Sequence, residues 1–389
     1  MIIELLFWLA LALVFYTYLG YGILLFILVR IKRIFVKEKA FDSSFEPEVT
    51  LVIPAYNEQD YIADKAQNSL ELDYPKDKLR ILFITDGSTD NTPKILEGIE
   101  GVEVTHENIR AGKSAAENRA MTLVNTPIVV FCDANTYLNP ACIRNLVRHY
   151  TDPKVGAVSG EKRVLSKGAD TASAAGEGLY WKYESTLKKW DSELYTIVGA
   201  AGELISFRSE LVQDLEADTI LDDFVQTMRI CQQGYRVKYE PESFAAETAS
   251  DNVKEELKRK VRIAAGGWQS MARLLPILIP IPNPVLTFQY ISHRVLRWSI
   301  SALALPLIFV LNYFLIELGP LYEYLFYAQI AFYLLALLGW FLENRAIRVK
   351  ALFVPYYFLM MNYAVFAGFF RWLKGSQKAT WERAKRAKA

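Results

Sequence analysis

The sequence predicts an α/β domain with a mainly parallel β-sheet, flanked by apolar helical segments at both ends of the chain. Within residues 49–160, short apolar runs that are typical of buried strands alternate with helical patterns, which favours parallel strands joined by covering helices. Hydrophobic residues make up 52% of the 389 and are concentrated at the two ends. We therefore expect five regions: an N-terminal transmembrane anchor (1–33), a soluble α/β domain (46–273), interfacial helices (274–298), a C-terminal transmembrane region (299–373) and a basic tail (374–389).

Four strands and three helices account for the first half of the soluble domain. The strands are expected at Val49–Pro54, Leu79–Thr85, Val102–Thr105 and Pro127–Asp133. The helices are expected near Gln59–Leu72, Asn91–Ile99 and Lys113–Val124. In a sheet of this kind, ligands bind at the carboxyl ends of the strands.

Polar residues follow three of these strands. They are Tyr56, Asn57 and Glu58 after the first strand, Asp86 and Asp90 after the second, and Asp133 and Asn135 after the fourth. Helix capping explains a single acidic residue of this kind, such as Asp90. Three polar strand ends on one edge of one sheet instead indicate a ligand site.

The charge composition gives no support for nucleic-acid binding, because 44 Lys and Arg residues are balanced by 43 Asp and Glu residues. Cys132, Cys142 and Cys231 have neither metal-binding nor CxxC spacing, and so sparse a set suits a reducing compartment. The chain also has only three histidines. A carboxylate is therefore the expected general base.

The N-terminal segment is long and apolar enough to span a bilayer. Residues 2–31 are apolar apart from Glu4 and Arg30, and about 20 such residues cross the hydrocarbon core. A signal peptide would instead have a basic leader and a shorter apolar core. Here the positive charges follow the apolar run, which marks that side as cytoplasmic; they are Arg30, Lys32, Arg33, Lys37 and Lys39.

Three more apolar runs follow the soluble domain: Ser299–Leu318, Leu321–Leu342 and Ala351–Phe370. The segment before them is apolar but interrupted by prolines, which favours an interfacial position; they are Pro276, Pro280, Pro282 and Pro284. Three spans would put the basic tail outside, whereas basic segments favour the cytosol. A third run that is re-entrant or interfacial, interrupted by Pro355, Asn362 and Gly368, would resolve this conflict.

Aromatic residues also gather between Tyr180 and Tyr195. Their spacing fits one face of an amphipathic helix, which indicates packing in a core or an interface. Stacking on carbohydrate is the alternative.

Three short motifs resemble those of the family-2 glycosyltransferases, which include cellulose, hyaluronan and poly-N-acetylglucosamine synthases. The motifs are PAYNE (Pro54–Glu58), DGSTD (Asp86–Asp90) and AGKSAAENRA (Ala111–Ala120). The resemblance covers residues 49–269 and implies a GT-A fold that binds a nucleotide-sugar. Tyr56, Glu58 and Asp86 would then contact the base and ribose. Lys113, near a helix start, would contact the nucleotide or its diphosphate.

The stretch DAN (Asp133–Asn135) occupies the place of the family's DxD motif. On this resemblance, Asp133 and Asn135 would hold Mg²⁺ or Mn²⁺ against the diphosphate, because both ions prefer oxygen ligands. The ion would neutralise charge on the leaving nucleoside diphosphate. Asn135 departs from the family pattern, in which the second ligand is an aspartate, and its amide oxygen brings less charge.

LDDF (Leu221–Phe224) resembles the family's acidic base motif. The resemblance implies that Asp223 takes the proton of the acceptor hydroxyl and that Asp222 supports it. The alternative is that both acids simply favour a helix N-terminus. In VGAAGELISFR (Val198–Arg208), Gly199 and Gly202 would let the acceptor approach the backbone closely, with tight packing as the alternative.

The family's final motif, QxxRW, is matched only in part. Arg262 fits its arginine and would bind the diphosphate bidentately. Neither the Gln nor the Trp is in register. Trp268, further along, would either stack on the acceptor sugar or anchor the domain at the membrane interface. This departure argues against processive synthesis, since the family's tryptophan helps to hold a polymer.

The resemblance implies an inverting, multi-pass enzyme of the plasma membrane with a cytosolic catalytic domain. It would transfer a sugar from a nucleotide-sugar, a UDP-sugar by analogy, to a glycan and so make a β-linked exopolysaccharide. A polymer channel through so few helices would need a second copy of the chain or an export partner. One alternative is a single transfer to a lipid such as polyprenyl phosphate or a diacylglycerol. The other is a nucleotide-sugar-binding membrane protein without turnover.

Overall fold

A computed structural model of the chain describes residues 1–36, 41–42, 44–165, 172–248, 253–281, 283–345, 347 and 349–378. Several predicted features lie outside these residues: Lys37, Lys39, Pro282 and most of the basic tail. The side chains of Tyr180 and Trp181 are likewise outside the description, although their helix is not.

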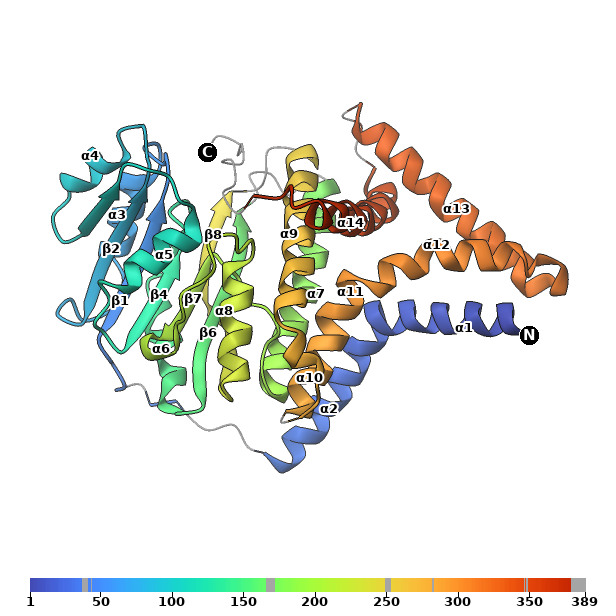
Figure 1. Cartoon of the computed structure of the whole chain (residues 1–389), viewed down its shortest axis with the longest axis horizontal. Coiled ribbons are helices and arrows are strands. Elements are labelled where there is room, and N and C mark those ends of the chain that lie inside the picture. The colour runs from blue at the N-terminus through green and yellow to red at the C-terminus, as the bar shows by residue number, and fades with distance from the viewer. Residues whose placement is uncertain are drawn as a thin grey trace.

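The strands in the described residues form one mixed sheet in the order β3-β2-β1-β4-β7-β6-β8-β5 (Figure 1). β1, β2, β3 and β4 are parallel, as are β6 and β8, whereas β7 is antiparallel to both of its neighbours and β5 to β8. The predicted mainly parallel α/β fold is therefore confirmed. The strands are β1 (Val49–Ala55), β2 (Leu79–Asp86), β3 (Glu103–Glu107), β4 (Ile128–Cys132), β5 (Tyr137–Leu138), β6 (Val155–Leu165), β7 (Leu204–Arg208) and β8 (Arg236–Thr248).

Alternate residues of each strand point to opposite faces of the sheet, and both faces are buried. On β1, Val49, Leu51 and Ile53 belong to one core cluster, while Val52 belongs to the other. The first cluster is covered by α3 (Ile62–Leu70), α4 (Thr92–Glu97) and α6 (Cys142–Val147). The second is covered by α5 (Lys113–Met121) and α8 (Asp222–Gln232).

The predicted strands and helices agree with the observed ones to within a few residues at each end. The largest shift is at α3, which begins at Ile62 rather than near Gln59. The backbone N–H of Gln59 donates to Asp90 Oδ2, and the Gln59 side chain accepts from the N–H of Asn91. These bonds tie the segment before α3 to the loop after β2 and keep it out of the helix.

Three helices are long and apolar enough to cross a membrane: Ile2–Phe35, Pro320–Glu343 and Ala351–Leu373. The first comprises α1 (Ile2–Phe15), a π-helical turn η1 (Tyr16–Gly20) and α2 (Tyr21–Phe35); the others correspond to α13 (Pro320–Glu343) and α14 (Lys350–Leu373). Pro355 does not interrupt α14, which runs on as one helix. The interruption that a re-entrant segment would need is therefore absent from this helix.

The expected span Ser299–Leu318 is shorter than predicted. α12 (Ile300–Tyr313) has 14 residues. It is long enough to cross a membrane only together with the preceding helical segment, Pro284–Trp298, from which it is bent by 53°. That segment consists of α10 (Pro284–Tyr290), η5 (Ile291–Val295) and α11 (Leu296–Trp298). α12 lies beside α1, away from the sheet (Figure 1).

Two long helices join the sheet domain to the apolar helices: α7 (Ala172–Leu194) and α9 (Val253–Arg273) (Figure 1). α2 packs on α7, where Tyr21, Leu25 and Val29 are fully buried in a cluster with Leu187. At the end of α2, Lys32 donates to the backbone carbonyls that close α7. The predicted packing role of the aromatic helix is confirmed for Trp190, which contacts Phe26 of α2.

We expect Leu25→Ala to destabilise the contact between α2 and α7, because it removes a fully buried side chain and leaves a cavity. Such substitutions cost about 2–5 kcal/mol. Ile27→Ala is the matched control, since Ile27 lies on the same helix and is 46% exposed. Thermal unfolding of the detergent-solubilised chain should show a clear loss for Leu25→Ala alone. Equal effects of the two substitutions would contradict the observed packing.

Candidate active site

The carboxyl ends of β2, β1 and β4 lie side by side, because these strands are parallel neighbours in the sheet. The loops that follow β1 and β2 are bonded to each other: Asn57 Oδ1 accepts from the N–H of Thr89 at 2.8 Å, and the N–H of Glu58 donates to Thr92 Oγ1 at 2.8 Å. Arg110 covers the ring of Tyr56, with its guanidinium carbon 3.7 Å from the ring centroid. The polar strand ends therefore form one edge, as predicted.

Asp86 shapes the turn that leads into α5. It is 4% exposed, and its Oδ2 accepts from the N–H groups of Ala111 and Gly112 at 3.0 and 2.6 Å. Its Oδ1 accepts from Arg119 at 3.0 Å. Gly112 has a φ of +101°, a conformation that glycine adopts readily. In the absence of a ligand, Asp86 thus fixes the position of the next residue, Lys113.

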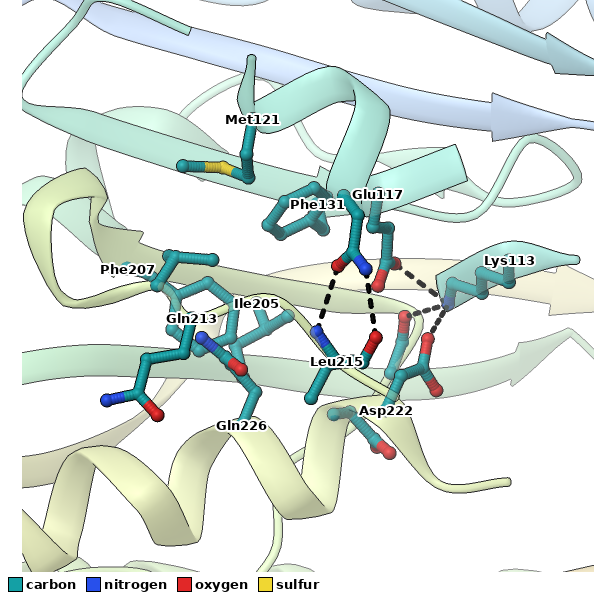
Figure 2. Close-up of a pocket in the computed structure, with 14 residues that line it drawn as sticks. Lys113, Glu117, Met121, Phe131, Ile205, Phe207, Gln213, Leu215, Asp222 and Gln226 are labelled. Atoms are coloured by element: carbon teal, nitrogen blue, oxygen red, sulfur yellow. Dashed lines mark hydrogen bonds and ion pairs between the residues drawn. The ribbon is translucent and has the colours of Figure 1, made fainter. Parts of the chain in front are cut away.

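Lys113 is the centre of the site (Figure 2). Its Nζ donates to Asp133 Oδ1 at 2.7 Å and to the carbonyl of Gly202 at 3.1 Å. Asp222 Oδ2 and Glu117 Oε1 each lie 3.8 Å from the same nitrogen. Burial opposes the charge on Lys113, but these three carboxylates together raise its pKa well above the usual value. One ammonium therefore joins α5, β4, β7 and α8.

Asp223 lies at the start of α8, next to the backbone of Gly202. A Cβ at Gly202 would be 3.1 Å from Asp223 Oδ2, so a side chain there would crowd the carboxylate. Burial and the neighbouring Asp222 raise the pKa of Asp223 to about 7, against the lowering effect of Lys113. A carboxylate with such a pKa is suited to accept a proton near neutral pH.

Arg262 of α9 lines the same cavity and interacts electrostatically with Asp222, Asp223 and Asp133. The motif residues Lys113, Asp133, Asp222, Asp223 and Arg262 are thus brought together.

The two predicted metal ligands fit a divalent cation. Asn135 Oδ1 is buried and accepts no hydrogen bond from the residues that the structure describes, and Asp133 lies two positions before it at the edge of the site. No three His, Cys, Asp or Glu side chains in the described part of the chain would hold a metal by themselves. Mg²⁺ and Mn²⁺ sites of this kind take further oxygen ligands from a diphosphate and from water.

Lys65 holds the turn that carries both oxygens and was not singled out from the sequence. It is 1% exposed and donates to the carbonyl of Thr136 at 2.9 Å and to Cys132 Sγ at 3.0 Å. Its position inside α3 resembles that of many solvated lysines, so no local pattern identifies it. Glu117 was also missed, although its spacing of four residues from Lys113 is a usable signal.

A cavity of about 1150 Å³ extends from these carboxylates to the apolar helices. Its walls include Gly199 and Gly202, the two glycines predicted to face the acceptor. Trp268 instead packs against α14: its indole N–H donates to the carbonyl of Val365, and its ring lies 4.8 Å from that of Phe369. These contacts favour the anchoring role of Trp268 over stacking on an acceptor.

Residues 50–215 match a family model described as glycosyl transferase family 2. Poly-β-1,6-N-acetyl-D-glucosamine synthases are among the similar proteins. That of Staphylococcus aureus is 29% identical over 236 residues, which are 58% of this chain and 56% of the relative. That of Staphylococcus epidermidis is 25% identical over 257 residues, 61% of each protein. The matches therefore span less than two thirds of these relatives' length.

A solved structure is similar over nearly the whole chain. It is a mannosyltransferase from Pyrobaculum calidifontis in complex with GDP-Man and Mn²⁺, with a TM-score of 0.73 and 25% sequence identity. The alignment covers 95% of this chain and 99% of that one. The sheet, the carboxylates at its edge and these matches together identify a family 2 glycosyltransferase domain with a GT-A fold in this chain.

Proposed function

We propose that the protein is an inverting, membrane-embedded glycosyltransferase that uses Asp223 as its general base. The observation that carries this proposal is the placement of Asp223. Its pKa is raised to about 7, and it lines the same cavity as Lys113, Asp133 and Arg262. The cations in this set can bind a donor diphosphate while Asp223 faces the acceptor.

The transfer forms one bond and breaks another. The acceptor hydroxyl oxygen attacks the anomeric carbon, and its proton passes to the Asp223 carboxylate. The bond between the anomeric carbon and the diphosphate oxygen breaks, and its electron pair leaves with the nucleoside diphosphate. A single base suffices, because the diphosphate leaves without protonation; glycoside hydrolases need two carboxyl groups. Lys113 and Arg262 stabilise the charge that develops on the leaving group.

Asp133 and Asn135 would hold the divalent cation, which supplies charge neutralisation to the diphosphate when it is bound. Its arrival would also give Asp133 a second cationic partner besides Lys113, which now bonds to it at 2.7 Å. Tyr56, Glu58 and Asp86 lie on the neighbouring strand ends and would contact the nucleoside.

Two acceptor classes are supported by different observations. The staphylococcal relatives are named as polysaccharide synthases, which favours a glycan acceptor and a β-linked product. The cavity wall formed by α14 and η1 is largely apolar. This wall favours a lipid-linked acceptor. The basic residues that end α2 favour a cytosolic catalytic domain at the plasma membrane.

We expect Asp223→Asn to lower the rate of sugar transfer by about 10²–10⁴-fold, the usual contribution of a general base. The measurement is release of nucleoside diphosphate across a panel of UDP- and GDP-sugars, with Mn²⁺ and a membrane lipid extract as the source of acceptor. Asp214→Asn, at an exposed position, is the matched control. Full activity of Asp223→Asn would assign the base elsewhere. Donor binding without release by the wild-type chain would instead favour a non-catalytic protein.

The pH dependence of kcat/KM should report the same group, because this ratio reflects the ionisation of the free enzyme. Asp223 acts when deprotonated, so kcat/KM should rise about tenfold per pH unit below about 7 and level off above it. Burial, Asp222 and Glu203 raise this pKa, whereas Lys113 and the backbone N–H of Phe224 lower it. A profile that stays flat down to pH 5 would contradict the assignment.

Substitution of Asn135 tests the metal site. Asn135→Asp should tighten Mn²⁺ binding, because it adds a charge to the ligand set, and Asn135→Ala should weaken it by at least about tenfold. Electron paramagnetic resonance of free Mn²⁺, recorded in the presence of a nucleoside diphosphate, measures binding without turnover. Asn145→Asp, distant on α6, is the control. Unchanged Mn²⁺ affinity in both Asn135 variants would exclude this residue as a ligand.

A further inference from the structure

Lys188 is a buried cation that the catalytic reaction does not use. It lies on α7 and lines the large cavity, yet its side chain is only 8% exposed. It makes no hydrogen bond or ion pair with the residues that the structure describes; its one recorded contact is with the ring of Tyr239, 6.0 Å from the ammonium. Burying an ammonium group without an anionic partner is costly. A ligand that brings negative charge would offset this cost.

Two arginines line the same end of the cavity. Arg294 lies 3.6 Å from Glu184, and Arg297 forms a close ion pair with the same carboxylate. Burial opposes ionisation of Glu184, but Arg297, His293 and Arg294 hold its pKa well below the usual range. Arg294 and Arg297 therefore share one contacting carboxylate, and Lys188 adds a third positive charge to the same cavity.

Other carboxylates near Lys188 are bonded to other groups. Glu203 forms an ion pair with Lys162, and Glu161 accepts a hydrogen bond from Ser185. Burial and Arg294 lower the pKa of Lys188, although Glu184, Glu161 and Glu203 act in the opposite direction. An anion bound between Lys188 and Arg294 would raise this pKa.

The backbone from Gly199 to Gly202 links this cluster to the base. A Cβ at Gly199 would lie 3.2 Å from two guanidinium nitrogens of Arg294, and one at Gly202 would lie 3.1 Å from Asp223 Oδ2. Three peptide steps of 3.8 Å span at most about 11 Å. Lys113 bonds to the carbonyl of Gly202, so the donor diphosphate belongs to that end. The cluster at Gly199 is a separate anion site on the acceptor side.

Beyond the cluster, the cavity wall becomes apolar. It is formed by Leu19 of η1 and by Phe358, Met361 and Val365 of α14. These residues belong to two of the helices that are long and apolar enough to span a membrane. A ligand that fills the cavity would therefore lie against the carboxylate of Asp223, the ammonium of Lys188 and the apolar side chains of η1 and α14.

We propose that the acceptor is a lipid-linked sugar whose connecting phosphate or diphosphate binds at Lys188, Arg294 and Arg297. This inference rests on the proposed glycosyltransferase function and names its substrate class. The acceptor hydroxyl belongs to the sugar and reaches Asp223, while the lipid chain follows the wall of α14.

The test is lipid binding by the purified full-length chain in detergent, measured by native mass spectrometry. The probes are a polyprenyl phosphate, the matching polyprenol, inorganic phosphate and a β-linked glucosamine oligosaccharide. We expect saturable binding of the polyprenyl phosphate and weak binding of the other three. Lys188→Gln should weaken binding of the lipid phosphate by at least about tenfold, while Lys188→Arg should retain it. Lys189→Gln, on the exposed side of the same helix, is the matched control.

The inference is overturned if polyprenol binds as tightly as its phosphate, or if Lys188→Gln and Lys189→Gln behave alike. Preferential binding of the oligosaccharide would assign the cavity to a glycan. If Lys188→Gln does not fold, the comparison of phosphate with alcohol in the wild-type chain still decides. Release of nucleoside diphosphate from the donor in the wild-type chain is measured separately, so that loss of the lipid result and loss of the glycosyltransferase function are distinguished.

Discussion

Lys113 allows the carboxylates of this site to lie close together in a partly enclosed space. Like charges at such distances raise one another's pKa, and burial adds to the effect. Burial and Asp222 raise the pKa of Glu117 well above its usual value, whereas Lys113 counteracts them. Lys113 contacts groups from α5 and α8, the carboxylate that follows β4 and a carbonyl just before β7. Its position therefore determines how the sheet edge packs against the start of α8, where Asp222 and Asp223 lie. The turn held by Asp86 fixes the position of this lysine at the start of α5.

The acceptor side depends on close approaches between elements, which small residues permit. A Cβ at Gly267 of α9 would lie 2.7 Å from the ring of Trp298, and one at Gly266 would lie 2.6 Å from Leu221, just before α8. Trp298 also lies 5.0 Å from Phe224, the neighbour of the base. α9 and α11 are thereby held against the start of α8, and their arginines enter the same cavity. A side chain at either glycine would push these helices away from the carboxylates.

The parts that the sequence predicted well are those with a local physical signal. β1, β2 and β4 are short apolar runs followed by polar residues, and their parallel order brings Glu58, Asp86 and Asp133 to one edge whatever the rest of the chain does. The role of Trp268 could not be predicted, because its partners lie on α14, almost a hundred positions away. The cluster at Lys188 could not be predicted for the same reason, because α7, η5 and α11 contribute its cations from distant parts of the sequence. Pro355 was interpreted as an interruption, but α14 runs from Lys350 to Leu373 with this proline inside it.

The proposed anion site bears on whether the enzyme makes a polymer. A processive synthase must let its product move by one sugar after each transfer, which requires contacts that are equivalent along the chain. A phosphate held by Lys188 and Arg294 would oppose such movement, because it would keep one end of the acceptor in place. The partial match to the family's tryptophan motif, with Ile263 after Arg262, points the same way. Retention of the acceptor by its phosphate therefore favours a single transfer, with chain length set by the site rather than by substrate supply.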